Sequence, residues 1–308
     1  MTAHRWTYDE IPDLTGQTAI VTGASSGIGT VEARELAKHG AHVVLAVRNV
    51  DAGRQVAERV AAAAGRGDTP AVRHLDLASL ASVGAFAAET DHPVDLLVNN
   101  AGVMYPPRWT ATQDGHELQF GTNHLGHFAL TGLLLPRLLD APAPRVTTVA
   151  SIAHRHGDAD VVEGNPRAGY SPQRAYGRSK LANLMFALEL ERRATEAGAR
   201  LTSNAAHPGI STTGLMTDRE GMGASGVVRA VAPYVMRLLF PGPEQGAEAI
   251  LYAATVAGPG TYTGPQHLGE SRGPVGPAKM SQMATNTDLA RLLWERSEEL
   301  TGVTYRWS

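Results

Sequence analysis

A glycine-rich turn, Thr22-Gly23-Ala24-Ser25-Ser26-Gly27-Ile28-Gly29, stands between an apolar segment and an amphipathic one near the start of the chain. The apolar residues of 17–22 predict a short buried strand, and the pattern after the turn predicts a helix to about His39. Glycine permits a tight turn and close approach of the backbone to a pyrophosphate, while the helix N-terminus offers free N–H groups. The sequence therefore predicts dinucleotide binding, with a turn that binds no nucleotide as the alternative.

Strand-like and helix-like segments alternate along the chain with short connections. This alternation predicts an α/β fold: a Rossmann-type doubly wound parallel sheet of about seven strands with helices on both faces. No repeat or linker divides the chain, so we expect a single NAD(P)-binding domain over residues 1–308. The predicted strands cover 17–22, 41–47, 72–75, 95–98, 145–150 and 201–206, with a seventh marked by Tyr262, and further helices cover 51–64, 79–89, 114–139, 176–197, 244–257 and 288–300.

Composition excludes several other classes of protein. The net charge of -3 gives no electrostatic reason to expect a nucleic-acid or membrane partner. The absence of cysteine excludes disulfides and thiolate metal sites, and no His/Asp/Glu cluster has metal-ligand spacing, so we expect no metal. The first ten residues are polar and no apolar run is long enough to span a bilayer, so the expected location is cytoplasmic.

Polar and glycine residues stand at the predicted carboxyl ends of four strands, where open α/β sheets bind ligands. They are Thr22–Gly29, Arg48, Asp76 and Asn99–Gly102. An acid at the end of the second strand would select NAD, but here the strand ends in Arg48-Asn49. A guanidinium offers planar donors to a 2′-phosphate, so we expect NADP(H) rather than NAD(H). The alternative for Arg48 is a solvated loop residue or a partner for Asp51.

Tyr176 and Lys180 are four residues apart on a predicted helix, which places them on one face. A free phenol has a pKa of about 10, and a nearby ammonium group would lower that pKa. The pair is therefore a candidate general acid–base unit. Taken alone, the same spacing also fits an ordinary solvated helix face.

The ordered set of motifs resembles the short-chain dehydrogenase/reductase family over roughly residues 16–265. The glycine turn is similar to its cofactor motif, Asn99–Gly102 to its fourth-strand motif, and His207-Pro208-Gly209 to the motif after its sixth strand. Asn123, Ser151, Tyr176 and Lys180 match its catalytic tetrad.

One branch of this family, the retinol-dehydrogenase and WW-domain oxidoreductase branch, has similar local sequences. Gly121–Phe128, Ser151–His154 and the long gap before Tyr176 all resemble it, as does Leu293-Trp294-Glu295. Ala150 departs from the branch, which usually has a second serine at that position.

The resemblance implies a role for each member of the tetrad. Tyr176 would exchange a proton with the substrate oxygen, and Lys180 would lower its pKa and hold the nicotinamide ribose. Ser151 would stabilise the substrate oxygen, with a strand-end serine as the alternative. Asn123 would hold a water that links Lys180 to solvent, with a polar residue in a helix bend as the alternative. Asp76 is similar to an adenine contact, and a helix cap is its alternative.

The whole implied cofactor-binding set comprises Gly23, Ser25, Ser26, Gly27, Ile28, Gly29, Arg48, Asn49, Asp76, Leu77, Asn100, Ala101, Gly102, Tyr176, Lys180, Pro208 and Gly209.

The resemblance implies an NADP(H)-dependent oxidoreductase that transfers a hydride between nicotinamide and a carbonyl or secondary alcohol of a small, largely apolar substrate. A nucleotide-sensing protein and a lyase or epimerase of the same fold stay open as alternatives. The resemblance also leaves a homodimer open, because the family often pairs subunits through its long helices.

Two regions outside the regular strand–helix alternation complete the expectations. Residues 152–173 are expected to form a polar loop, with His154 and His156 as surface or loop residues near the substrate entrance. Residues 210–243 interrupt the alternation and are expected to form a substrate lid, with a packed helical cap as the alternative. The candidate lid lining is Leu215, Met216, Met222, Val231, Tyr234 and Met236.

Overall fold

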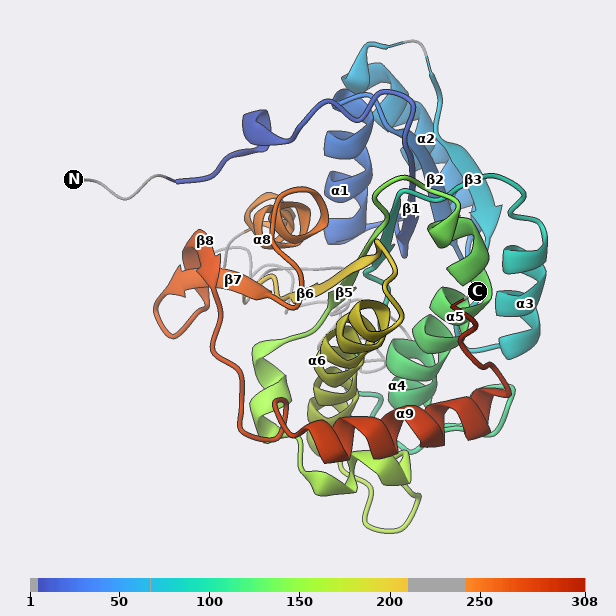
Figure 1. Cartoon of the computed structure of the whole chain (residues 1–308), viewed down its shortest axis with the longest axis vertical. Coiled ribbons are helices and arrows are strands. Elements are labelled where there is room, and N and C mark those ends of the chain that lie inside the picture. Colours follow the sequence, from blue (N-terminus) through green and yellow to red (C-terminus); the bar gives the residue numbers. More distant parts are fainter. Residues whose placement is uncertain (1–4, 67, 210–241, 308) are drawn as a thin grey trace.

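The computed structural model describes residues 5–66, 68–209 and 242–307, and its centre is one eight-stranded sheet (Figure 1). The strand order is β3-β2-β1-β4-β5-β6-β7-β8. All neighbouring strands are parallel except β7 and β8, which are antiparallel. The strands are β1 (Thr18–Thr22), β2 (His42–Val47), β3 (Ala71–His74), β4 (Leu96–Asn99), β5 (Arg145–Val149), β6 (Thr202–Ala206), β7 (Tyr262–His267) and β8 (Arg272–Pro277). The predicted doubly wound α/β fold is confirmed.

Helices cover both faces of this sheet (Figure 1). One face packs against α1 (Gly27–Lys38), α2 (Val50–Ala64) and α8 (Pro243–Thr255). The other packs against α3 (Leu80–Ala88), α5 (Gly126–Leu139) and α6 (Pro172–Glu196). The strands are buried on both faces, which is why they read as continuous apolar runs.

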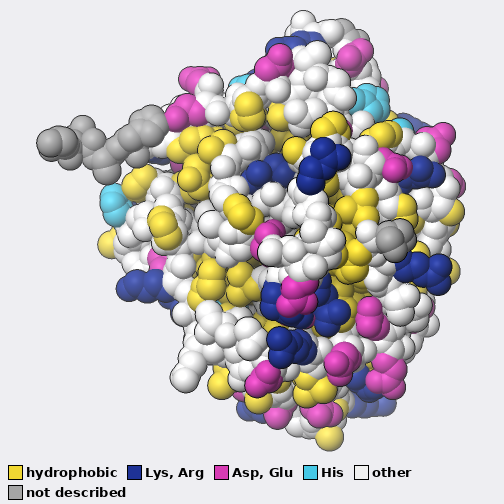
Figure 2. Space-filling model, in the orientation of Figure 1, with side chains coloured by type: hydrophobic (Ala, Val, Ile, Leu, Met, Phe, Trp, Pro, Cys, Tyr) yellow, Lys and Arg dark blue, Asp and Glu magenta, His cyan; other side chains and the backbone are white. Residues whose placement is uncertain are grey.

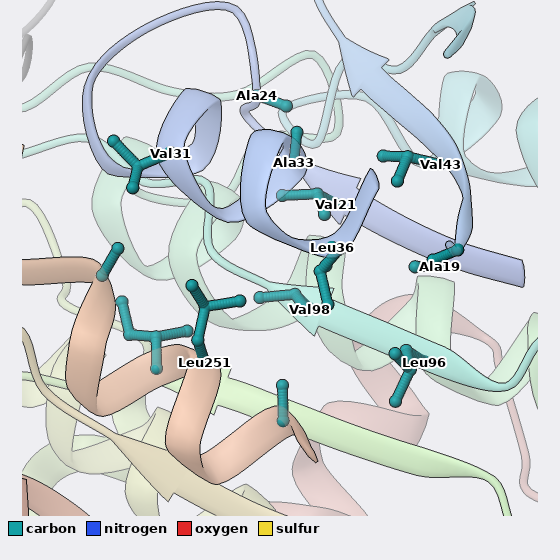
Figure 3. Packing of buried hydrophobic residues seen from close by; sticks show 14 of the residues in the cluster. Ala19, Val21, Ala24, Val31, Ala33, Leu36, Val43, Leu96, Val98 and Leu251 are labelled. Atoms are coloured by element: carbon teal, nitrogen blue, oxygen red, sulfur yellow. The ribbon is translucent and has the colours of Figure 1, made fainter. Parts of the chain in front are cut away.

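Alternate residues of each central strand supply the two cores. Ala19 and Val21 of β1 pack with Val98 of β4 beneath α1 and α8, as Figure 3 shows. Ile20 and Leu97 point to the opposite face and join the core under α5 and α6. Successive side chains of a strand point to opposite faces of the sheet. This alternation therefore determines which helix layer each strand residue faces.

The helix predicted over 114–139 differs from the observed structure at its start. Residues Ala111 and Glu117 form an isolated β-bridge around a turn with Gly115 at φ +85°. The Glu117 side chain then accepts a hydrogen bond from Phe120 N and caps α4 (Leu118–Phe120). A π-helical turn, η2 (Gly121–Leu125), joins α4 to α5, so the predicted single helix is three consecutive segments.

Three other segments are more ordered than predicted. The expected polar loop 152–173 contains two 3₁₀ helices, η3 (Ile152–His156) and η4 (Ala159–Glu163). The chain after β7 returns as β8 rather than ending the sheet. The polar lead-in contains a short 3₁₀ helix, η1 (Tyr8–Glu10), and buries Trp6, whose ring contacts Tyr252 of α8 at 5.6 Å between centroids.

The last helix, α9 (Thr287–Thr301), crosses the outer side of α6 (Figure 1). Its Trp294 is 2% exposed and packs against Phe128 of α5 and Phe186 of α6 at ring distances of 5.0 and 5.8 Å. The chain beyond α9 returns to α5, where Tyr305 OH donates to Phe128 O at 2.7 Å. This aromatic cluster attaches the C-terminal helix to the helix layer that carries Tyr176.

Replacing Trp294 with alanine is expected to lower the free energy of unfolding by about 3–5 kcal/mol, because it leaves a large cavity among the rings of Phe128, Phe186 and Tyr305. Urea unfolding followed by circular dichroism measures the loss. Leu292→Ala is the matched control on the same helix, since Leu292 is 51% exposed. Equal stabilities of the two variants would contradict the packing role assigned to Trp294.

Acidic and basic side chains are interspersed over the face seen in Figure 2. In the described ranges, no helix combines the length and apolar character needed to cross a membrane. Within those same ranges, no three His, Asp or Glu side chains are grouped so that they could hold a metal ion.

Candidate functional site

A cavity of about 720 Å³ opens at the carboxyl ends of the parallel strands. Every residue of the predicted cofactor-binding set lies on its wall. Three members of the predicted tetrad, Ser151, Tyr176 and Lys180, line it as well. Asn123 does not line the cavity and is fully buried behind it.

The glycine turn is closely packed against the residues that follow β4. A Cβ atom on Gly23 would lie 2.9 Å from Ala101 Cα, and one on Gly29 would lie 2.7 Å from Asn100 Nδ2. Ser26 precedes α1 without making a side-chain cap, whereas Asn49 caps α2. The first N–H groups of α1 therefore face the cavity without a side-chain acceptor from Ser26, which fits a cofactor pyrophosphate.

The Thr22 hydroxyl connects this turn to the fourth-strand motif. It accepts hydrogen bonds from Asn100 N at 2.9 Å and Ala101 N at 3.0 Å. Its other neighbours are His127 Nε2 at 2.9 Å and Val98 O at 3.2 Å, and His127 Nδ1 lies 2.9 Å from Asn123 O. Since a carbonyl oxygen can only accept, Nδ1 carries the proton, and Nε2 and Val98 O are both acceptors for the Thr22 hydroxyl. Burial lowers the pKa of His127 to about 4, which keeps this ring neutral.

Arg48, Asn49 and Asp76, which were predicted to select the cofactor or contact its adenine, also line the cavity. Arg48 and Asn49 follow β2, with the Arg48 side chain exposed and Asn49 accepting a hydrogen bond from Ala52 N. Asp76 accepts a hydrogen bond from Ala78 N at 2.9 Å, while Ser79 caps α3. Asp76 is therefore not the cap of α3, and its carboxylate borders the cavity.

Tyr176 is 7% exposed on α6 and faces the cavity beside Ser151. Burial raises the pKa of Tyr176 above its usual value, and its hydrogen bond with Ser151 acts in the opposite direction. The expected net lowering of this pKa is therefore not found in this structure, because desolvation of the phenolate outweighs the favourable contacts. Tyr176 is a protonated phenol at neutral pH, suited to donate a proton.

Lys180 lies one helical turn beyond Tyr176, with Nζ 5.9 Å from the centroid of the tyrosine ring. Nζ donates to Val149 O at 2.9 Å, and the same carbonyl accepts from Asn183 Nδ2 at 3.1 Å. Burial lowers the pKa of Lys180 to about 8. The carbonyl at the end of β5 thus orients the ammonium group toward the cavity wall.

Asn123 lies inside the π-helical turn η2. Its Oδ1 accepts from Val103 N at 2.7 Å, and its Nδ2 donates to Val103 O at 3.0 Å and Ser179 Oγ at 2.9 Å. Ser179 in turn donates to Tyr176 O at 2.9 Å. Asn123 therefore connects the segment after β4 to the helix of the tyrosine, and its role in a water relay stays a prediction.

The expectation for His154 as a surface or loop residue was wrong. His154 is fully buried, and Ser281 N donates to its Nε2 at 3.2 Å. Nδ1 therefore carries the proton and donates to Ser151 O at 2.7 Å, which anchors the backbone of Ser151. His156 is exposed and lines the cavity, as expected for a residue near the substrate entrance.

Among the cavity-lining residues that the sequence prediction missed are Met104, Tyr105, Ile152 and Ala153. Met104 and Tyr105 lie two and three positions after Gly102, and Ile152 and Ala153 lie one and two positions after Ser151. Closeness to a predicted motif was therefore the sequence signal that could have identified them. The predicted lid lining falls within residues 210–241 and lies outside the described residues.

The chain belongs to the short-chain dehydrogenase family, whose model, described as short chain dehydrogenase, matches residues 17–222. This family uses NAD(P)(H). The chain is 38% identical to human (Homo sapiens) retinol dehydrogenase 13 and 41% identical to mouse (Mus musculus) polyprenol dehydrogenase. These alignments cover 94% and 95% of this chain and 86% of each relative.

A crystal structure of an uncharacterized protein from Mycobacterium paratuberculosis is 39% identical, with a TM-score of 0.81 over 98% of this chain and 100% of that chain.

Proposed function

We propose that this protein is an NADP(H)-dependent oxidoreductase that acts on a carbonyl or secondary alcohol of a small, largely apolar substrate. The observation that carries this proposal is that Ser151, Tyr176 and Lys180 share a cavity with the N-terminus of α1. A bound nicotinamide cofactor would supply or accept the hydride. Ser151, Tyr176 and Lys180 would carry out the remaining chemistry, which is proton transfer and stabilisation of the substrate oxygen.

The role of each side chain follows from its surroundings. Tyr176 is a protonated phenol and gives its proton to the substrate oxygen during reduction. Ser151 stabilises the charge that develops on the same oxygen by donating a hydrogen bond. Lys180, held by the Val149 carbonyl, provides positive charge beside the phenolate that forms when Tyr176 loses its proton.

The substrate end of the cavity supports an apolar ligand. Met104, Tyr105, Ile152 and Ala153 line the wall around the tyrosine and serine. The names of the relatives specify retinol and polyprenol, both primary alcohols, so the proposed substrate class includes primary alcohols and aldehydes beside secondary alcohols and ketones. An apolar alcohol or the matching carbonyl compound is therefore the substrate class that we propose for this chain.

The proposal is tested by incubating the protein with NADPH and a panel of apolar aldehydes and ketones. Net oxidation of nicotinamide together with alcohol formation is the expected result. Binding of NADPH without turnover of any compound would favour a nucleotide-sensing protein. Conversion of substrate without net change in the cofactor would favour a lyase or epimerase.

Replacing Arg48 with aspartate is expected to weaken NADPH binding about tenfold or more and to change NADH binding little. A guanidinium–phosphate contact at an exposed position contributes about 1.5–3 kcal/mol, and a carboxylate there would repel the 2′-phosphate. Calorimetric titration of both cofactors measures the change. Arg54→Asp is the matched control, because Arg54 lies on α2 outside the cavity lining. Wild-type protein that binds NADH as tightly as NADPH would refute the preference.

A further inference from the structure

Tyr105 has a backbone conformation that tyrosine rarely adopts. Its φ is +56°, in the left-handed region where the Cβ atom is crowded by the backbone. It also precedes Pro106, a position that favours extended backbone instead. Such conformations persist only where the surrounding structure imposes them, and they gather at functional sites.

A buried side chain holds the backbone of Tyr105. The Tyr105 N–H donates to Gln119 Oε1 at 2.9 Å, and Gln119 is fully buried in α4, just before the π-helical turn η2. Gln119 Nε2 donates to Pro172 O at 3.1 Å and to Tyr170 OH at 3.2 Å. The first residue of α6 thus holds Gln119 in place. Gln119 in turn holds the backbone of Tyr105 at a set position relative to the helix that carries Tyr176.

The Tyr105 ring lies against the catalytic tyrosine. The two ring centroids are 5.0 Å apart at an interplanar angle of 74°, an edge-to-face arrangement. Tyr105 is half-buried and lines the cavity together with Ser151 and Tyr176. The part of its side chain that is not covered by Tyr176 therefore borders the space beside the atom that would react.

We propose that Tyr105 is a specificity-determining residue: a fixed aromatic wall that favours substrates with a flat apolar group attached to the reacting carbon over compact aliphatic ones. This inference rests on the proposed function and deepens it. An aromatic ring attracts another flat ring in offset or edge-to-face geometry, which a small alkyl group cannot reproduce. The backbone fixes the Tyr105 Cβ atom, and the edge-to-face contact with the buried Tyr176 ring holds the Tyr105 ring in place as a wall of the cavity.

The test compares 2-acetylnaphthalene with 2-butanone, both methyl ketones. For each protein, kcat/KM with NADPH is measured, and the dissociation constant of each ketone is measured by calorimetry in the presence of NADP⁺. Wild type is expected to prefer the naphthyl ketone in both measurements. Tyr105→Leu should reduce that preference at least tenfold, whereas Tyr105→Phe should keep it within threefold, because the proposal assigns the effect to the ring.

Tyr105→Gly separates the wall from a folding effect. Glycine adopts positive φ without strain, so this variant should keep its melting temperature within a few degrees while its preference falls as in Tyr105→Leu. Tyr252→Leu is the control, because Tyr252 is also half-buried but packs on Trp6. Its preference should match wild type.

Two results would overturn the proposal: a wild type without preference for the naphthyl ketone, or an unchanged preference in Tyr105→Leu. Wild type that binds the naphthyl ketone in a Tyr105-dependent way but transfers no hydride would support the wall and refute the proposed reaction. The binding measurement therefore separates failure of this inference from failure of the proposed function.

Discussion

Replacing Tyr176 with phenylalanine is expected to lower kcat for carbonyl reduction by a factor on the order of 10²–10⁴ or more, and to leave NADPH affinity within about threefold. Phenylalanine keeps the ring that packs against Tyr105 and removes the transferable proton. The substrate oxygen would then have to take its proton from water instead of from a positioned phenol. Single-turnover kinetics with saturating NADPH measures the chemical step directly, and calorimetric titration measures cofactor binding.

Tyr252→Phe is the matched control for this prediction, because it removes a tyrosine hydroxyl on α8, outside the cavity lining. Its kcat should equal that of wild type. Turnover of Tyr176→Phe within threefold of wild type would remove the proton-donor role from this residue. An unchanged kcat with weakened NADPH binding would instead assign Tyr176 to cofactor binding alone.

The parallel core of the fold could be predicted because each central strand is a short apolar run followed by a turn signal. Ala19, Ile20 and Val21 are buried in two different cores, so both faces of β1 had to be apolar. The glycine turn then predicted the junction between the first strand and the first helix. Because this turn follows a strand, it also predicted the end of the sheet at which the cavity lies.

The antiparallel edge could not be predicted by the same reasoning. Strand β8 has the sequence Arg272-Gly-Pro-Val-Gly-Pro277, and proline and glycine normally argue against a strand. They are tolerated here because β8 lies at the end of the sheet order. The sequence after β7 is therefore typical of a loop, although Pro277 and Gly276 pair with Thr263 and Gly264.

The candidate site could be predicted where its residues belong to a local motif and not where they depend on distant contacts. The turn 23–29 and the residues after β4 are contiguous, so their spacing was informative. His154 is buried by Ser281 and Tyr262, more than a hundred positions away. Tyr105 owes its position to Gln119 and Tyr170, which nothing in its own segment indicates.

Glu32 is a buried carboxyl group at a position where ionisation would be costly. It lies on α1 with its side chain fully buried, and neither carboxyl oxygen has a hydrogen-bond partner among the residues that the structure describes. Glu35, one turn further, is instead paired with Arg34 and Lys38. Burial raises the pKa of Glu32 from 4.5 to about 8, since an ionised carboxylate is poorly solvated in the protein interior.

This shift makes the stability of the wild-type protein depend on pH. Below pH 4.5 Glu32 is protonated in both the folded and the unfolded chain, so it contributes no pH dependence. Between pH 4.5 and about 8 only the folded chain keeps the proton, and unfolding releases it. The free energy of unfolding should therefore fall by about 1.4 kcal/mol per pH unit across this range from this group, and level off above it.

Glu32→Gln is expected to remove this component, because glutamine keeps the shape of the side chain and does not ionise. Relative to wild type, the variant should gain stability progressively from pH 5 to pH 8, reaching on the order of 5 kcal/mol at the upper end. Urea unfolding at pH 5, 6, 7 and 8 measures the difference.

Glu58→Gln on the exposed side of α2 is the control, and its curve should run parallel to that of wild type. A Glu32→Gln curve that also runs parallel to wild type would show that Glu32 ionises in the folded protein with its ordinary pKa. In that case the carboxylate must reach water or a cation, and α1 would not cover it as the structure indicates. A Glu32→Gln curve that diverges from the wild-type curve up to about pH 8 and runs parallel to it above that pH is the result expected for a carboxyl group whose pKa is raised by burial.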